Sequence, residues 1–311
     1  MAEIKYWNPV RIAWERMVNV LFRPFELEKW MVMGFAAWFA GLNAGGGSGG
    51  SGGGSQPGSF GDGLSNGKEA FIEFWAEYGT LILTIGSGVL LLCIVFGVIF
   101  AWVAARGKFV FLDNVVQNRA AIVEPWKKYR KQGNSLFLWN LAVGCISLII
   151  LLGILAICIP MAWPMFASKT NIPMGIGAIV LGICLLMIYT LCLAYLEVFV
   201  YDFVVPLMLK YDIGIRAAWS RFSVILKPRF GTFIVYGLIR SLLSTGVGMA
   251  LMAAYIMTCC CLLFLAAIPY IGTVLLLPIL VFYRFLGLEF MRQFGDDFSV
   301  DNVNPTLPRV Y

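Results

Sequence analysis

The sequence predicts an all-α integral membrane protein: a bundle of about six transmembrane helices in one membrane domain over residues 1–311. The first observation is composition, since 60% of the residues are hydrophobic and 13% are charged. Ordinary soluble domains carry roughly 25% charged residues. The second is that several apolar runs exceed the ~20 residues that a helix needs to cross a ~30 Å hydrocarbon core. Both observations place the chain in a membrane.

Six apolar segments are the candidate spans. In chain order they are residues 30–44, 81–103, 136–167, 175–209, 232–257 and 271–291. Residues 258–270 are apolar too, so seven spans are the main alternative. The first run is short and follows an amphipathic stretch, which predicts an uncleaved anchor and not a cleavable signal peptide.

The basic residues alternate along the chain in a way that predicts the orientation of the spans. The segments expected in the cytoplasm carry 20 Lys and Arg residues, and those expected outside carry two, Lys68 and Lys169. Cytoplasmic loops are enriched in Lys and Arg. We therefore expect both termini in the cytoplasm.

A short pattern occurs twice, as RIAWERM at residues 11–17 and RAAWSRF at 216–222, with a weaker copy in EPWKKYRKQGN at 124–134. Each copy precedes an odd-numbered span. This predicts three repeats of about 100 residues, each an amphipathic surface helix followed by a transmembrane hairpin. We expect the helices to lie in the cytoplasmic interface, and a docking face for a cytoplasmic protein partner is the alternative. Their expected lipid anchors are Trp14, Arg16, Trp126, Lys128, Trp219 and Arg221.

The first outer loop is expected to have two parts. Residues 45–66 are rich in Gly and Ser and predict a flexible coil. Such segments occur both as natural low-complexity loops and as engineered linkers. Residues 67–78 place aromatic side chains on one helical face and acidic ones on the other. This predicts a helix on the outer membrane surface, or else an N-terminal extension of the second span.

Four charged residues fall inside or near the ends of predicted spans, where charge is costly. They are Glu197, Asp202, Arg240 and Glu289. Intramembrane charges usually face the bundle interior in pairs and mark candidate functional sites. We expect Arg240 to pair with Glu197 or Asp202. Two alternatives are extension of Arg240 to the inner headgroups and a ligand or proton path.

The residues that usually carry catalysis or bind metal are scarce. The chain has no histidine, which excludes a Ser–His–Asp hydrolase and a His-bound zinc enzyme. The eight cysteines match no zinc or redox spacing. No nucleotide-binding or nucleic-acid-binding motif is present, and the net charge of +6 follows from the cytoplasmic bias. We expect no cofactor and no nucleic-acid partner.

The C-terminal third shows a family resemblance, which covers roughly residues 195–297. The segments YDFVVPLM (201–208), AW (218–219), FGTFIVY (230–236) and the stretch 268–295 carry it. They resemble uncharacterised bacterial six-helix membrane proteins akin to the membrane domain associated with glycerophosphodiester phosphodiesterases. The resemblance implies the membrane fold and a bacterial inner membrane. The catalytic domain and its histidine and carboxylate cluster are absent, so it implies no catalytic residue.

Three functions fit these features. We expect a non-enzymatic multi-pass protein that organises lipid or a membrane or cytoplasmic partner. The alternative is a transporter or channel subunit that uses Arg240, Glu197 and Asp202. A membrane enzyme acting on lipid is disfavoured, because histidine and a clustered set of carboxylates are missing.

Overall fold

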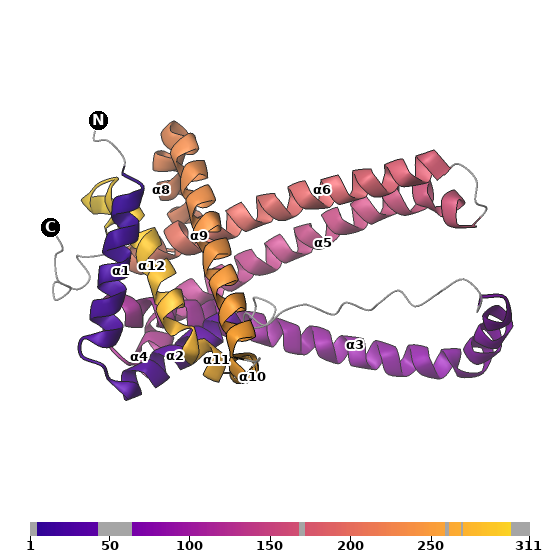
Figure 1. Cartoon of the computed structure of the whole chain (residues 1–311), viewed down its shortest axis with the longest axis horizontal. Coiled ribbons are helices and arrows are strands. Elements are labelled where there is room, and N and C mark those ends of the chain that lie inside the picture. The colour runs from indigo at the N-terminus through magenta and orange to yellow at the C-terminus, as the bar shows by residue number, and fades with distance from the viewer. Residues whose placement is uncertain (1–4, 43–63, 168–171, 259–260, 269, 300–311) are drawn as a thin grey trace.

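The fold is helical throughout the part of the chain that the computed structural model describes. That part comprises residues 5–42, 64–167, 172–258, 261–268 and 270–299. Within these ranges every regular element is a helix (Figure 1) and no strand forms. The predicted all-α class is therefore confirmed.

A core of short helices lies at one end of the molecule (Figure 1). Its elements are α1 (Trp7–Phe22), α2 (Leu27–Gly41), α4 (Val123–Lys128), the π-helical turn η1 (Val200–Val204), α7 (Val205–Tyr211), α8 (Ile215–Leu226) and α12 (Leu277–Arg292). Fully buried aromatic rings fill its centre: Phe203, Phe222, Phe233 and Phe290. The ring centroid of Phe203 lies 5.3 Å from that of Phe222 and 5.2 Å from that of Phe233. These contacts join η1 and α8 to the start of α9.

Four long helices extend out of this core. They are α3 (Leu64–Gln117), α5 (Arg130–Ala167), α6 (Ile172–Phe199) and α9 (Phe230–Met257). α3, α5 and α6 project from the same side of the core, and α9 runs across them in a different direction (Figure 1). Beyond the core their side chains are apolar and exposed, among them Leu91, Ile149, Met187 and Met252.

Among the described residues, four helical stretches are long and apolar enough to cross a membrane. They are Leu83–Gln117, Arg130–Met165, Ile172–Tyr211 and Ile215–Met257. Each of the second to fifth predicted spans overlaps one of these four stretches. The prediction of a membrane protein with several apolar helices is therefore confirmed.

The first predicted span corresponds to α2, which is as short as expected, and the last predicted span is divided. α2 has 15 residues, and the expected helix over 271–291 is divided into α11 (Ile271–Leu275) and α12. Pro278 accounts for the division, because it lies in the first turn of α12, where proline starts a helix and does not continue one. The connecting α10 (Cys261–Ala267) has seven residues, too few to cross a bilayer.

The outer loop can be assessed only in part. Residues 43–63 lie outside the described residues, so most of the predicted Gly/Ser coil over 45–66 does too. α3 begins at Leu64 and runs to Gln117 as one helix. The segment 67–78 is therefore continuous with the second span, as the second alternative predicted, and its place at the outer membrane surface stays a prediction.

The copies of the repeated pattern form helices of decreasing length. The first lies in α1 and the second in α8, which have 16 and 12 residues. The third covers most of α4, which has six residues and ends before Tyr129, and continues into the start of α5 at Arg130. The weak third copy in the sequence thus corresponds to the shortest helix.

Candidate functional site

A π-helical turn at the end of α6 positions the central charged residues. Proline at 206 has no N–H to donate to the carbonyl oxygen of Asp202, and its ring would clash with that carbonyl in a regular α-helix. The chain widens here, and the N–H of Val205 donates to the carbonyl oxygen of Val200. The carbonyl oxygen of Tyr201 is left without its helical partner and accepts from Arg284 Nη1 at 2.9 Å. π-Helical turns occur frequently at functional sites.

Asp202 is the acidic centre of this site. Its side chain is 1% exposed, and Oδ2 lies 2.6 Å from Nη1 of Arg240. The hydroxyl of Tyr236 donates to the same oxygen at 2.8 Å. Arg240 and Tyr236 lie one turn apart on α9, so the carboxylate connects α6 to α9. Of the two partners expected for Arg240, the structure brings Asp202 to it.

Close packing of α12 against η1 completes the site. A Cβ atom at Gly287 would lie 2.9 Å from Cβ of Asp202, so only glycine permits this approach. The guanidinium carbon of Arg240 lies 5.0 Å from the ring centroid of Tyr283 on α12. Arg284, one residue further on, carries a second positive charge near the carboxylate. The Asp202 carboxylate therefore interacts electrostatically with two guanidinium groups, those of Arg240 and Arg284.

Glu197 lies apart from this pair, one turn before η1. Its side chain is exposed and lines an open groove of about 190 Å³ between α5 and α6, together with Trp139, Asn140 and Tyr201. Lys108 of α3 interacts electrostatically with Glu197. Lys108 itself is buried, with Nζ 3.4 Å from the ring centroid of Tyr201. Glu197 thus belongs to a polar groove and not to the Arg240 pair.

Glu289 forms a second buried ion pair, with Arg16. Nε of Arg16 lies 2.9 Å from Oε1 of Glu289, and both side chains are 3% exposed. Arg292 lies 3.6 Å from the other oxygen. The prediction of Arg16 as a lipid anchor is therefore wrong. Arg16 shares the buried face of α1 with Met17 and Val20, and Glu289 offsets the cost of burying its charge.

The other expected anchors divide between exposed and packed residues. Trp14 is 59% exposed, and Lys128 and Arg221 are exposed as well. Trp126 and Trp219 are half-buried: Trp126 packs edge-on against Trp102, and Trp219 packs against Trp139 and Phe222. The two half-buried tryptophans attach α4 and α8 to the long helices.

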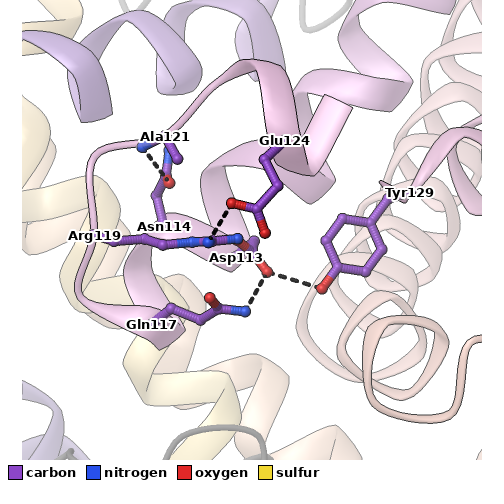
Figure 2. Close-up of polar contacts among 7 residues, drawn as sticks. All are labelled: Asp113, Asn114, Gln117, Arg119, Ala121, Glu124 and Tyr129. Atoms are coloured by element: carbon purple, nitrogen blue, oxygen red, sulfur yellow. Dashed lines mark hydrogen bonds and ion pairs between the residues drawn. The ribbon is translucent and has the colours of Figure 1, made fainter. Parts of the chain in front are cut away.

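A further polar cluster lies at the C-terminal end of α3, and the sequence did not predict it. Asp113 is fully buried and accepts hydrogen bonds from Tyr129 Oη at 2.8 Å, Gln117 Nε2 at 2.7 Å and Arg119 Nη2 at 2.8 Å (Figure 2). Arg119 also donates to Glu124 at 2.7 Å. Burial and the charge of Asp113 raise the pKa of Tyr129. The cluster fixes the loop between α3 and α5. The acidic residue between the predicted second span and the third copy of the repeated pattern was the signal for it.

These features define a helical membrane protein whose buried charges join helices that are distant in the sequence. The chain belongs to a family of unknown function (DUF7544), whose model matches residues 8–294. No curated protein and no solved structure matches the chain. A relation to the membrane domain associated with glycerophosphodiester phosphodiesterases is not shown by these comparisons, whereas membership of an uncharacterised family agrees with the expectation.

Proposed function

We propose that the chain is a non-enzymatic multi-pass protein of the bacterial inner membrane that organises lipid around its helices. The observation that carries the proposal is the contrast between the core and the four long helices. Charged groups in the core are engaged in contacts between helices, whereas the outer parts of α3, α5, α6 and α9 expose almost continuous apolar surface. A surface of this kind and extent requires an apolar solvent.

We further propose six membrane segments, arranged as three repeats, with both termini in the cytoplasm. The four long stretches supply four of the segments. α2 and the α11–α12 unit supply the other two and pack against each other, since Tyr270 Oη donates to the carbonyl oxygen of Met31 at 3.1 Å. With 15 residues α2 spans ~22 Å, and local thinning of the bilayer accommodates so short a segment.

The arrangement of polar groups supports a role without catalysis. Asp202, Asp113 and Glu289 each accept from an arginine, so these carboxylates are used to hold the fold. Across the described ranges, no three His, Cys, Asp or Glu residues gather as a metal-ligand set. In this proposal the partners are membrane lipids and, at the cytoplasmic face, a protein. Nucleic acid has no part in it.

Labelling of single cysteines in spheroplasts tests the topology. In a cysteine-free background, cysteines placed at Ser59 and Lys169 should react with a membrane-impermeant maleimide, and those at Lys131 and Arg216 should react only after lysis. If α2 does not cross the bilayer, residue 59 lies on the same side as the N-terminus. Protection of residue 59 would therefore overturn the six-segment arrangement.

A transporter or channel subunit is the second candidate, and the groove that contains Glu197 favours it. Purified protein in proteoliposomes should then carry a proton or cation current that Glu197→Gln abolishes. Our first proposal expects ion flux equal to that of protein-free liposomes. The same measurement therefore separates the two candidates.

A further inference from the structure

Arg106 is a buried cation that has no counter-ion in the part of the chain that the structure describes. It lies on α3 near the end of the second predicted span and is 7% exposed. Its Nε and Nη2 donate to the neutral Oδ1 of Asn134 at 3.3 and 2.9 Å, and its guanidinium carbon lies 4.1 Å from the ring centroid of Trp102. Among the described residues, no carboxylate lies within ion-pair distance of it. A buried charge of this kind is costly unless an anion compensates it.

An apolar cleft of about 360 Å³ opens beside Arg106. It lies between α2, α3 and α4, and six of its lining residues are Phe35, Phe39, Val103, Gly107, Val110 and Trp126. Gly107 permits α3 to pack closely against α2, since a Cβ atom at this position would lie 2.8 Å from the backbone of Phe39. The ring of Trp126 connects the cleft to the cation, because its centroid lies 5.4 Å from the guanidinium carbon of Arg106.

Further positive charge surrounds this corner. Lys127, Lys128, Arg130 and Lys131 follow Trp126 directly and are all exposed. Arg130 is close enough to Arg106 for the two guanidinium groups to repel each other. The one carboxylate on α4, Glu124, accepts from Arg119 and does not compensate these cations. The excess positive charge therefore favours an anion.

We propose that this corner binds one anionic phospholipid. Its phosphate accepts hydrogen bonds from Arg106 and is stabilised by Arg130 and Lys127, and one acyl chain occupies the cleft lined by Phe39 and Trp126. Clusters of basic residues at the cytoplasmic end of a membrane helix recognise anionic headgroups, and tryptophan lies at the depth of the headgroups. The inference rests on the proposed membrane location and specifies the lipid class and its site.

Competition between lipids tests the proposal on the full-length protein. Delipidated protein in detergent is mixed with equimolar phosphatidylglycerol and phosphatidylcholine of identical acyl chains, and native mass spectrometry measures the ratio of the two bound species. Wild type should prefer phosphatidylglycerol. Arg106→Gln should lower that ratio about fivefold, the ~1 kcal/mol of one basic residue near the headgroups. Arg106→Lys should retain most of the preference.

Matched variants separate the site from general charge. Arg216→Gln removes an exposed arginine from α8 and should leave the ratio unchanged. If Arg106→Gln fails to fold, the exposed double variant Lys127→Gln/Arg130→Gln should still reduce the preference severalfold. The proposal would be overturned if Arg106→Gln or the double variant bound the two lipids in the same ratio as wild type. It would also be overturned if Arg216→Gln lost as much of the preference for phosphatidylglycerol as Arg106→Gln.

Two further arms identify what occupies the site. Phosphatidylglycerol with brominated acyl chains should quench less fluorescence in Trp126→Phe than in wild type, because the acyl chain contacts Trp126. Inorganic phosphate should not displace the lipid; displacement would show an anion site without an acyl-chain cleft and refute the lipid as occupant. A protein that labels with the expected topology but shows no lipid preference disproves this inference and leaves the proposed function intact.

Discussion

Removing the charge of Asp202 should destabilise the fold more than removing the charge of Arg240. The Asp202 side chain is 1% exposed, so Asp202→Asn leaves the Arg240 and Arg284 guanidiniums without their shared carboxylate. Breaking a buried pair in this way costs about 3–5 kcal/mol. The Arg240 side chain is 23% exposed, and after Arg240→Gln the carboxylate keeps the hydrogen bond from Tyr236. That change should cost about 1–3 kcal/mol, because solvent screens part of the lost interaction.

The double variant measures the coupling between the two residues. If Asp202 and Arg240 act as a pair, Asp202→Asn/Arg240→Gln should cost about 1–3 kcal/mol less than the sum of the single variants. Unfolding of the purified protein by increasing detergent denaturant, followed by circular dichroism, gives the free energies. Free energies that add to within ~0.5 kcal/mol would refute the pairing.

Exchanging the two residues is a poorer test, for a reason visible in the geometry. With an arginine at position 202, Arg284 would face a like charge in place of the Asp202 carboxylate. It would also have to fit against Gly287, where even a Cβ atom is excluded. The exchanged protein should therefore be less stable than either single variant even though the native pair is real.

Three more predictions follow from the other contacts. Glu289→Gln should lower the free energy of unfolding by about 3–5 kcal/mol in the same assay, whereas Glu15→Gln, in a pair whose side chains are 69% and 41% exposed, should cost less than ~1 kcal/mol. Burial and the charge of Asp113 raise the pKa of Tyr129 in the folded protein. The neutral hydroxyl therefore stabilises the fold below the unfolded pKa of about 10, and this stabilisation disappears as the pH rises through the higher folded pKa. Between pH 10 and higher pH, the melting temperature of Tyr129→Phe should consequently fall less than that of wild type. Gly287→Ala should cost about 1–3 kcal/mol by forcing α12 away from η1, measured again by detergent unfolding.

Composition and run length were enough to predict the class of the protein. A chain with 60% hydrophobic residues must either bury these residues inside the fold or place them in lipid. In lipid, a helix forms the hydrogen bonds of its backbone N–H and C=O groups internally. The pairing of Arg240 with Asp202 could be anticipated for a related reason. An isolated charge in an apolar run requires a partner, and few candidates occur at a similar depth.

The remaining contacts depend on tertiary structure that no local pattern encodes. Arg16 and Glu289 are 273 positions apart, and the faces of α1 and α12 meet only in the folded chain. Arg106 depends likewise on Asn134, which reaches it from the following long helix. Its significance comes from the carboxylate that is missing around it in the described structure, and a sequence cannot show which residues surround a side chain.

The repeated heptapeptide shows how one pattern serves two environments. Its third and seventh positions are buried in both copies, as Ala13 and Met17 in α1 and as Ala218 and Phe222 in α8. A small residue followed four positions later by a large apolar one makes a packing stripe on a helix, so the shared feature is a contact face. The sixth position differs: in α1 the arginine is buried against Glu289, and in α8 the equivalent arginine is exposed over a tyrosine ring, 4.0 Å from its centroid. The neighbouring helix, and not the motif, therefore decides whether this arginine forms an internal ion pair or stays exposed.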